Sequence, residues 1–221
     1  MMIKKNNIKT VFFDAGGILF TTRIPFNERV RTILKSLNVE EKIIENAIQK
    51  GNEYFSQYRD SGKWLNNWSE EKIYFEKYYS VIANEVNSNN NYLSERLFHL
   101  THYVNHCTLY PEVIDVLESL SKHYKLSVIS NALPSLDWVF DKLQIRKYFD
   151  SITISAFVCK AKPDEIIYRK ALENSHSNSE ESLFIDNKYA NVEAAKNVGM
   201  EGAHIDRSNG ENLNIVKDML I

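Results

Sequence analysis

The sequence predicts an α/β protein: a Rossmann-like, doubly wound parallel sheet with an all-helical segment inserted after its first strand. In the second half of the chain, short apolar runs that end in polar or small residues alternate with helical patterns. Residues 22–107, by contrast, show no convincing strand but are long enough for several helices. We therefore expect a core built from residues 1–21 and 108–221 and a helical cap at 22–107.

Five apolar runs have the length and composition of buried strands. The predicted strands are residues 10–14, 125–130, 151–155, 182–186 and 201–206. Parallel sheets of this kind bind their ligands beyond the carboxyl ends of the strands. Three polar residues fall at such ends, and we expect them to share one site: Asp14, Ser130 and Asp186.

Helices are predicted from apolar residues at helical spacing. After Pro111, which suits a first helical position, Val113, Val116, Leu117 and Leu120 form one such stripe. In the insertion, stripes begin at Val30 and Ile44. Ser69 and the two glutamates after it predict a helix start, and NSNNN (87–91) predicts a polar turn. Most aromatic residues of the insertion are expected to fill a helical bundle.

Composition excludes several classes of partner. The net charge is −2 and no basic block occurs, which argues against nucleic acid and anionic membranes. No apolar run approaches the roughly 20 residues of a membrane span, and the N-terminus lacks a signal-peptide cleavage pattern. Cys107 and Cys159 form no disulfide framework. We expect a soluble cytoplasmic protein, a monomer or a homodimer, that acts on a small molecule.

Four segments of the core carry a family resemblance. In chain order they are FFDAGGILF, VISNA, KAKPDEIIY and LFIDNKYANVEAAKNVGM. With these motifs the chain resembles the haloacid-dehalogenase-like hydrolase superfamily, whose members are mostly phosphatases. The resemblance covers about residues 1–21 and 108–221, and the insertion matches the family's helical cap in position and class. It implies a hydrolase acting on a small phosphorylated metabolite.

The resemblance also implies roles for individual residues. Asp14 matches the family's nucleophile, a carboxylate that forms an aspartyl-phosphate. Ser130, with Asn131 beside it, matches the hydroxyl that binds the transferring phosphoryl group. Lys162 matches the lysine that neutralises charge between nucleophile and phosphate. Asp186 matches a metal-binding acid.

The implied cofactor is Mg²⁺, which typically takes one or two carboxylates together with substrate oxygens and waters. By family analogy, Asp14, Asp186 and the main-chain carbonyl of residue 16 would bind it, and Asn187 and Asn191 would support it. Gly16 stands where most family phosphatases carry the acid/base, a group worth about 10²–10⁴ in rate. Asn187 replaces a frequent acid, so we expect weaker metal binding.

Three interpretations therefore remain open. The first and favoured one is a Mg²⁺-dependent phosphatase that is slow, or limited to good leaving groups. The second is a metal-independent 2-haloacid dehalogenase, because halide leaves without a proton; the acid at Asp186 argues against it. The third is a catalytically degenerate binding or regulatory protein. Within the cap, Arg59 and Lys63 flank the Ser61-Gly62 break and are weak candidates for substrate selection.

Overall fold

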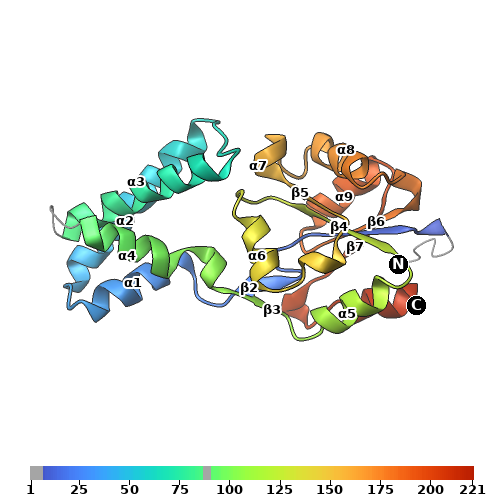
Figure 1. The fold of residues 1–221 in the computed structure, drawn as a ribbon, viewed down its shortest axis with the longest axis horizontal. Coiled ribbons are helices and arrows are strands. Elements are labelled where there is room, and N and C mark those ends of the chain that lie inside the picture. Colours follow the sequence, from blue (N-terminus) through green and yellow to red (C-terminus); the bar gives the residue numbers. More distant parts are fainter. Residues whose placement is uncertain (1–6, 87–90) are drawn as a thin grey trace. The chain divides into compact units, whose positions relative to one another are not determined.

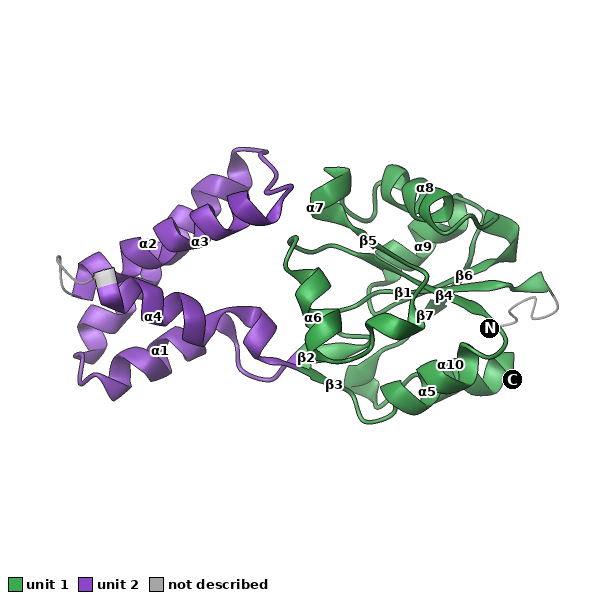
Figure 2. Cartoon of the chain, in the orientation of Figure 1, with its two compact units in different colours: residues 1–21, 108–221 green, residues 22–107 purple. Residues whose placement is uncertain are grey.

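The computed structural model describes residues 7–86 and 91–221. The backbone forms two compact units (Figure 2): an α/β unit of residues 1–21 and 108–221, and a helical unit of residues 22–107. Most of the polar turn predicted at 87–91 lies outside the described residues. No helix within the described ranges combines the length and apolar character needed to cross a membrane.

The α/β unit is built on a five-stranded sheet with the order β5-β4-β1-β6-β7 (Figure 1). Every pairing in it is parallel. The strands are β1 (Thr10–Phe13), β4 (Lys125–Ser130), β5 (Ser151–Ile154), β6 (Ser182–Asp186) and β7 (Glu201–His204). The doubly wound α/β fold is thereby confirmed, although β1 and β5 end one residue earlier than predicted and β7 ends two residues earlier. The strand order reverses at β1, so the first and central strand carries the switch point of the sheet.

Helices cover both faces of this sheet because its strands are apolar on both sides. On one face, Phe12, Ile129 and Phe184 pack against residues of α8 (Glu165–Asn174) and α9 (Tyr189–Asn197). The opposite side carries α5 (Val113–Leu120) and α10 (Asn214–Leu220), which lie next to each other (Figure 2). Two shorter helices follow β4 and β5: α6 (Leu136–Lys142) and α7 (Ser155–Val158).

Two short strands were not predicted. β2 (Phe20–Thr22) and β3 (Cys107–Leu109) pair with each other in a separate two-stranded sheet. They are the places where the chain leaves the α/β unit and returns to it. Three residues are too few for a periodic pattern, and their pairing partners lie 80 or more residues apart in the sequence, so local reasoning could not find them.

The helical unit contains α1 (Phe26–Ser36), α2 (Glu41–Asp60), α3 (Trp68–Val86) and α4 (Asn91–Thr101). Its centre is rich in aromatic rings, as predicted. Four of them are buried: Tyr74, Phe75, Tyr78 and Tyr79. Tyr54 stacks on Tyr74 with 5.4 Å between the ring centres. Trp64 is an exception, with 38% of its surface exposed.

Two predicted helix starts are corrected by the structure. The amide of Glu70 donates to the side chain of Asn67 at 3.0 Å, so Asn67 rather than Ser69 caps the N-terminus of α3. The helix predicted from Pro111 begins at Val113, and Pro111 and Glu112 form a turn. The carboxylate of Glu112 accepts a hydrogen bond from Arg207, an interaction with a residue almost a hundred positions away.

Candidate active site

Three neighbouring strands bring three predicted site residues to one edge of the sheet. β4, β1 and β6 are adjacent and parallel, and Ser130, Asp14 and Asp186 stand at or directly after their carboxyl ends. The amide of Asp14 continues the ladder by donating to the carbonyl of Ile185 at 2.8 Å. All three residues are buried, and Asp186 has no exposed surface. Because parallel strands share one carboxyl edge, three distant segments converge here.

Lys162 joins these carboxylates from the loop between α7 and α8. Its ammonium nitrogen lies 2.8 Å from Oδ1 of Asp14 and 2.7 Å from Oδ2 of Asp186. It also donates to the carbonyl of Ile129 at 2.8 Å, so each of its three N–H bonds has an acceptor. The side chain is 1% exposed, which is rare for a lysine and requires compensation of its charge. The structure thus fixes one cation between two buried acids.

The side chain of Asn131 holds the main chain of Lys162 in place. Its Oδ1 accepts from the amide of Lys162 at 2.7 Å, and its Nδ2 donates to the carbonyl of Lys162 at 2.8 Å. Both polar groups of this side chain are therefore engaged within the protein. Sequence reasoning placed Asn131 beside the substrate, which stays a prediction; in the structure its side chain holds the lysine segment to the end of β4.

Asp186 is oriented by its own neighbours in the sequence. Its Oδ1 accepts from the amide of Lys188 at 2.7 Å, and its Oδ2 accepts from Nδ2 of Asn191 at 2.9 Å. Asn191 is buried, and its carbonyl accepts from the hydroxyl of Tyr168 at 2.8 Å. Asn187 is exposed, and its carbonyl lies 3.1 Å from Nε2 of His204. Asn191 therefore contacts the acid directly, whereas Asn187 lies at the rim.

The charges of this cluster favour an added cation. Two carboxylates and one ammonium leave one negative charge in excess. Burial raises the pKa of Asp14, and although Lys162 opposes the rise, the nearby Asp186 adds to it. A cation beside both acids would stabilise the ionised form of Asp14. The site offers two acids, and Mg²⁺ typically takes one or two carboxylates while substrate and water supply its other oxygens. Within the described residues no group of three or more His, Cys, Asp or Glu gathers. The donor set fits Mg²⁺.

The two glycines after Asp14 have different surroundings. A Cβ built on Gly16 meets no heavy atom within 4 Å, so a side chain fits at this position. Gly17 has φ +85°, and a Cβ built there would lie 2.5 Å from Nδ2 of Asn187. Gly17 is therefore required by the backbone and by packing, whereas the missing side chain at residue 16 has no such cause.

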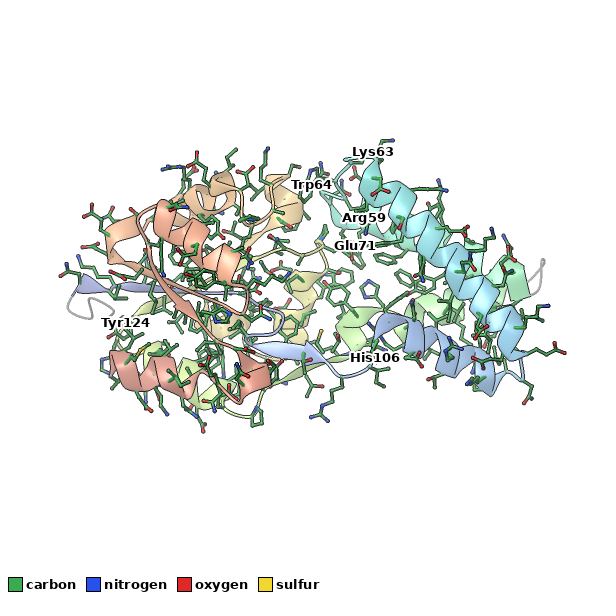
Figure 3. The ribbon with its side chains drawn as sticks, turned by 180° about the vertical axis from the view of Figure 1, so that it is seen from behind. Arg59, Lys63, Trp64, Glu71, His106 and Tyr124 are labelled. Carbon is green, nitrogen blue, oxygen red and sulfur yellow. The ribbon has the colours of Figure 1, made fainter. Side chains whose placement is uncertain are left out.

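Arg59 and Lys63 belong to the helical unit, near the passage from α2 to α3 (Figure 3). Both are exposed, and Nε of Arg59 lies 3.3 Å from Oδ1 of its neighbour Asp60. Trp64 lies next to them (Figure 3). Their part in substrate selection stays a prediction.

Sequence reasoning missed Arg207, which contacts the loop after Asp14. Its guanidinium donates to the carbonyls of Gly17 and Ile18 and to the carboxylate of Glu112. An isolated arginine after the last strand gives no recognisable pattern, and the glutamate that pairs with it lies on another segment. The interaction is visible only in three dimensions.

Taken together, the edge of the sheet offers two buried carboxylates, a hydroxyl and a buried ammonium. Such a set can bind an anionic group and can stabilise charge that develops on it. Residue 16 has no carboxylic acid that could donate a proton.

Known proteins share both the sequence pattern and the fold. The model of a family described as haloacid dehalogenase-like hydrolase matches residues 11–205. A phosphoglycolate phosphatase from Aquifex aeolicus is 35% identical over 96 residues, which cover 42% of this chain and 45% of that protein. The chain spans less than half the length of the curated relatives it matches.

Two solved structures resemble almost the whole chain. A HAD phosphatase from Thermococcus onnurineus superposes with a TM-score of 0.63 at 20% identity and covers 96% of this chain and 98% of its own. A 2-haloacid dehalogenase from Pseudomonas syringae pv. Tomato DC3000 gives a TM-score of 0.68 at 17% identity with the same coverage. At these identities the likeness shows the fold alone.

Proposed function

The chain belongs to the haloacid dehalogenase-like hydrolase family, and we propose that it is a Mg²⁺-dependent phosphatase of small phosphorylated metabolites. The observation that carries the proposal is the buried Lys162, whose ammonium group lies between Asp14 and Asp186. A fixed cation beside a carboxylate suits the attack of that carboxylate on a dianionic phosphate. The retained acid at Asp186 makes sense when there is a metal ion to bind.

In the proposed reaction, Oδ of Asp14 attacks phosphorus in line with the ester oxygen. The bond from phosphorus to that oxygen breaks, its electron pair stays on the leaving alcohol, and an aspartyl-phosphate forms. Water then attacks this intermediate and releases inorganic phosphate, which restores the carboxylate. Lys162 holds Asp14 in its buried position, and Ser130 offers a hydroxyl to the phosphoryl oxygens.

Asp14, Asp186 and the carbonyl of Gly16 would hold the metal ion, and Asn191 keeps Asp186 oriented. When bound, Mg²⁺ supplies positive charge to the phosphoryl oxygens. The leaving alcohol takes its proton from solvent, because residue 16 carries no acid. Turnover should therefore depend on the leaving group more steeply than in phosphatases that have an acid at this position.

A panel of phosphate esters tests the proposal. Purified protein with Mg²⁺ should release phosphate from p-nitrophenyl phosphate, whose leaving group needs no proton, and EDTA should stop the release. The name of the Aquifex relative directs the metabolite panel to small phosphorylated carboxylic acids such as phosphoglycolate. Failure on every ester would overturn the phosphatase and leave the dehalogenase and the binding or regulatory protein.

The dehalogenase stays as the second candidate. Gly16 leaves the site without a general acid at this position, and halide can depart without one. Its assay is halide release from 2-haloacids in EDTA. Activity there, with none on phosphate esters, would replace the first proposal. The buried carboxylate of Asp186 favours the phosphatase, because it is suited to a metal ion that halide departure does not need.

A further inference from the structure

Arg207 connects the turn after Asp14 to two other segments of the α/β unit. Its Nε donates to the carbonyl of Gly17 at 3.0 Å, and its Nη2 donates to the carbonyl of Ile18. The same Nη2 lies 2.7 Å from Oε1 of Glu112. The guanidinium carbon stands 3.5 Å above the ring of Tyr110. One side chain thus donates to two carbonyls of the first loop of the core and to a carboxylate beside α5, and it also stacks on an aromatic ring.

The turn it contacts is closed by main-chain hydrogen bonds that do not reach two of its carbonyls. The carbonyl of Ala15 accepts from the amides of Ile18, Leu19 and Phe20, and the amide of Gly17 donates to the carbonyl of Phe20. These bonds close a tight turn, but no amide of the turn donates to the carbonyls of Gly17 and Ile18. Ile18 and Leu19 are fully buried, so a carbonyl there that loses its partner would be costly. Arg207 supplies the donors.

Arg207 is itself held in position. Its side chain is 14% exposed, and the carboxylate of Glu112, 12% exposed, also accepts from the amide of Leu213 at 3.3 Å. The amide of Tyr110 donates to the carbonyl of Leu19 at 3.2 Å, so the ring under Arg207 is tied to the same turn. A guanidinium is planar and presents several donors in a fixed fork, which a lysine cannot reproduce. The contacts therefore define both the place and the orientation of the turn.

We propose that Arg207 is a positioning residue that fixes the main chain directly after the nucleophile, and with it the carbonyl of Gly16. The expected effect on catalysis rests on the proposed function, whereas the statement that Arg207 fixes this turn rests on the contacts alone. Gly17 is three residues from Asp14 and next to Gly16, so a rotated peptide at residue 17 displaces the neighbouring carbonyl. Displacements of about 1 Å at a reacting group can cost on the order of a hundredfold in rate.

Steady-state kinetics test the catalytic part. In Arg207→Gln, kcat for p-nitrophenyl phosphate should fall by about ten- to a hundredfold. The Mg²⁺ concentration that gives half-maximal activity should rise, and KM should change little. Arg207→Lys should recover only part of kcat. The matched control is Arg169→Gln, which removes an exposed arginine with a single carboxylate partner, Glu165; it should stay within about twofold of wild type. A residue with a merely structural role would lower the melting temperature but leave the Mg²⁺ dependence of the folded enzyme unchanged.

Hydrogen–deuterium exchange tests the structural part without any activity. Amides of residues 17–20 should exchange about tenfold faster in Arg207→Gln, as expected from the loss of a charge-assisted hydrogen bond, while those of β4 keep the wild-type rate. Glu112→Gln keeps an acceptor for Arg207, so it should give a smaller increase in the exchange rate of the same amides. This variant replaces Arg207→Gln in the experiment if Arg207→Gln does not fold. Wild-type exchange in both variants would overturn the inference. An inactive wild-type enzyme would overturn the phosphatase instead, and the exchange rates would still decide the role of Arg207.

Discussion

The ammonium nitrogen of Lys162 lies 2.8 Å from a carboxylate oxygen of Asp14, and both side chains are buried. Burying this pair costs solvation, which the second acid, Asp186, and the carbonyl of Ile129 offset in part. A buried ion pair is weak evidence of stability by itself. The pair lies at the switch point of the sheet, where doubly wound α/β proteins bind their ligands, and this position supports the role in the reaction that we propose for it.

Asp14→Asn should reduce phosphate release to background, because an amide cannot serve as the attacking carboxylate. The fold should be kept, since Asn occupies the same volume and Lys162 retains Asp186 as a partner. Phosphate release and circular dichroism on the same preparation check both statements. Normal turnover in this variant would show that another group attacks.

Gly16→Asp should raise turnover on alkyl phosphates more than on p-nitrophenyl phosphate. The space around residue 16 admits a side chain, and a general acid is worth about 10²–10⁴ where the leaving group needs a proton. The measurement is the ratio of kcat/KM for the two kinds of ester. An equal change for both esters would reject the missing acid as the cause of slow turnover.

Gly17→Ala is the control for that experiment. The added methyl group meets Asn187, and φ is +85°, so we expect a loss of about 1–3 kcal/mol in stability and no gain in activity. Chemical denaturation measures the stability change. A variant as stable as wild type would show that the turn relaxes easily.

Lys162→Met should destabilise the fold by about 3–5 kcal/mol at neutral pH, because two buried carboxylates then face each other without a cation. Protonation of one acid relieves the repulsion, so the loss should shrink as pH falls. Unfolding by denaturant at pH 5 and pH 7 in EDTA tests this dependence. A pH-independent loss would mean that the lysine acts through contacts other than the two acids, such as the cation–π contact of its Nζ, 5.1 Å from the centre of the Phe184 ring.

Asn131→Ala should lower kcat without a matching rise in KM. The variant removes both hydrogen bonds to the main chain of Lys162, and each such bond is worth about 1 kcal/mol. Kinetics on p-nitrophenyl phosphate separate the two parameters. A rise in KM alone would instead support the role suggested by the sequence, direct contact with the substrate.

Glu112→Gln should cost about 1–2 kcal/mol at pH 7, and the cost should shrink as the pH falls below 4.5. Burial opposes ionisation of Glu112, but hydrogen bonds from Arg207 and from main-chain amides hold its pKa below the ordinary value of 4.5. A carboxylate with a lowered pKa in the folded state stabilises the fold above its unfolded-state pKa, and this contribution disappears as pH falls through the folded value. Melting curves of both proteins from pH 3 to 7 give the difference, and a constant difference across this range would contradict the ion pair with Arg207.

The sequence alone was sufficient for the sheet and for its reactive edge. Apolar runs that end at Asp14, Ser130 and Asp186 predict buried strands, and parallel strands place their ends together whatever residues lie between them. The family resemblance of the segment around Lys162 added the cation. The strands and their shared edge follow from local patterns and from one rule of topology, and the lysine follows from the resemblance, so all of them could be predicted without coordinates.

Tertiary structure decided which hydrogen bonds hold the site and the ends of the helices in place. Only the packed chain shows that Asn131 holds Lys162, that Asn67 caps α3, and that Arg207 holds the turn after Asp14. Each of these choices depends on the distance and direction between particular side chains and main-chain groups. Hydrogen bonds are short and directional, and where their partners are far apart in the chain, sequence spacing contains no information about them.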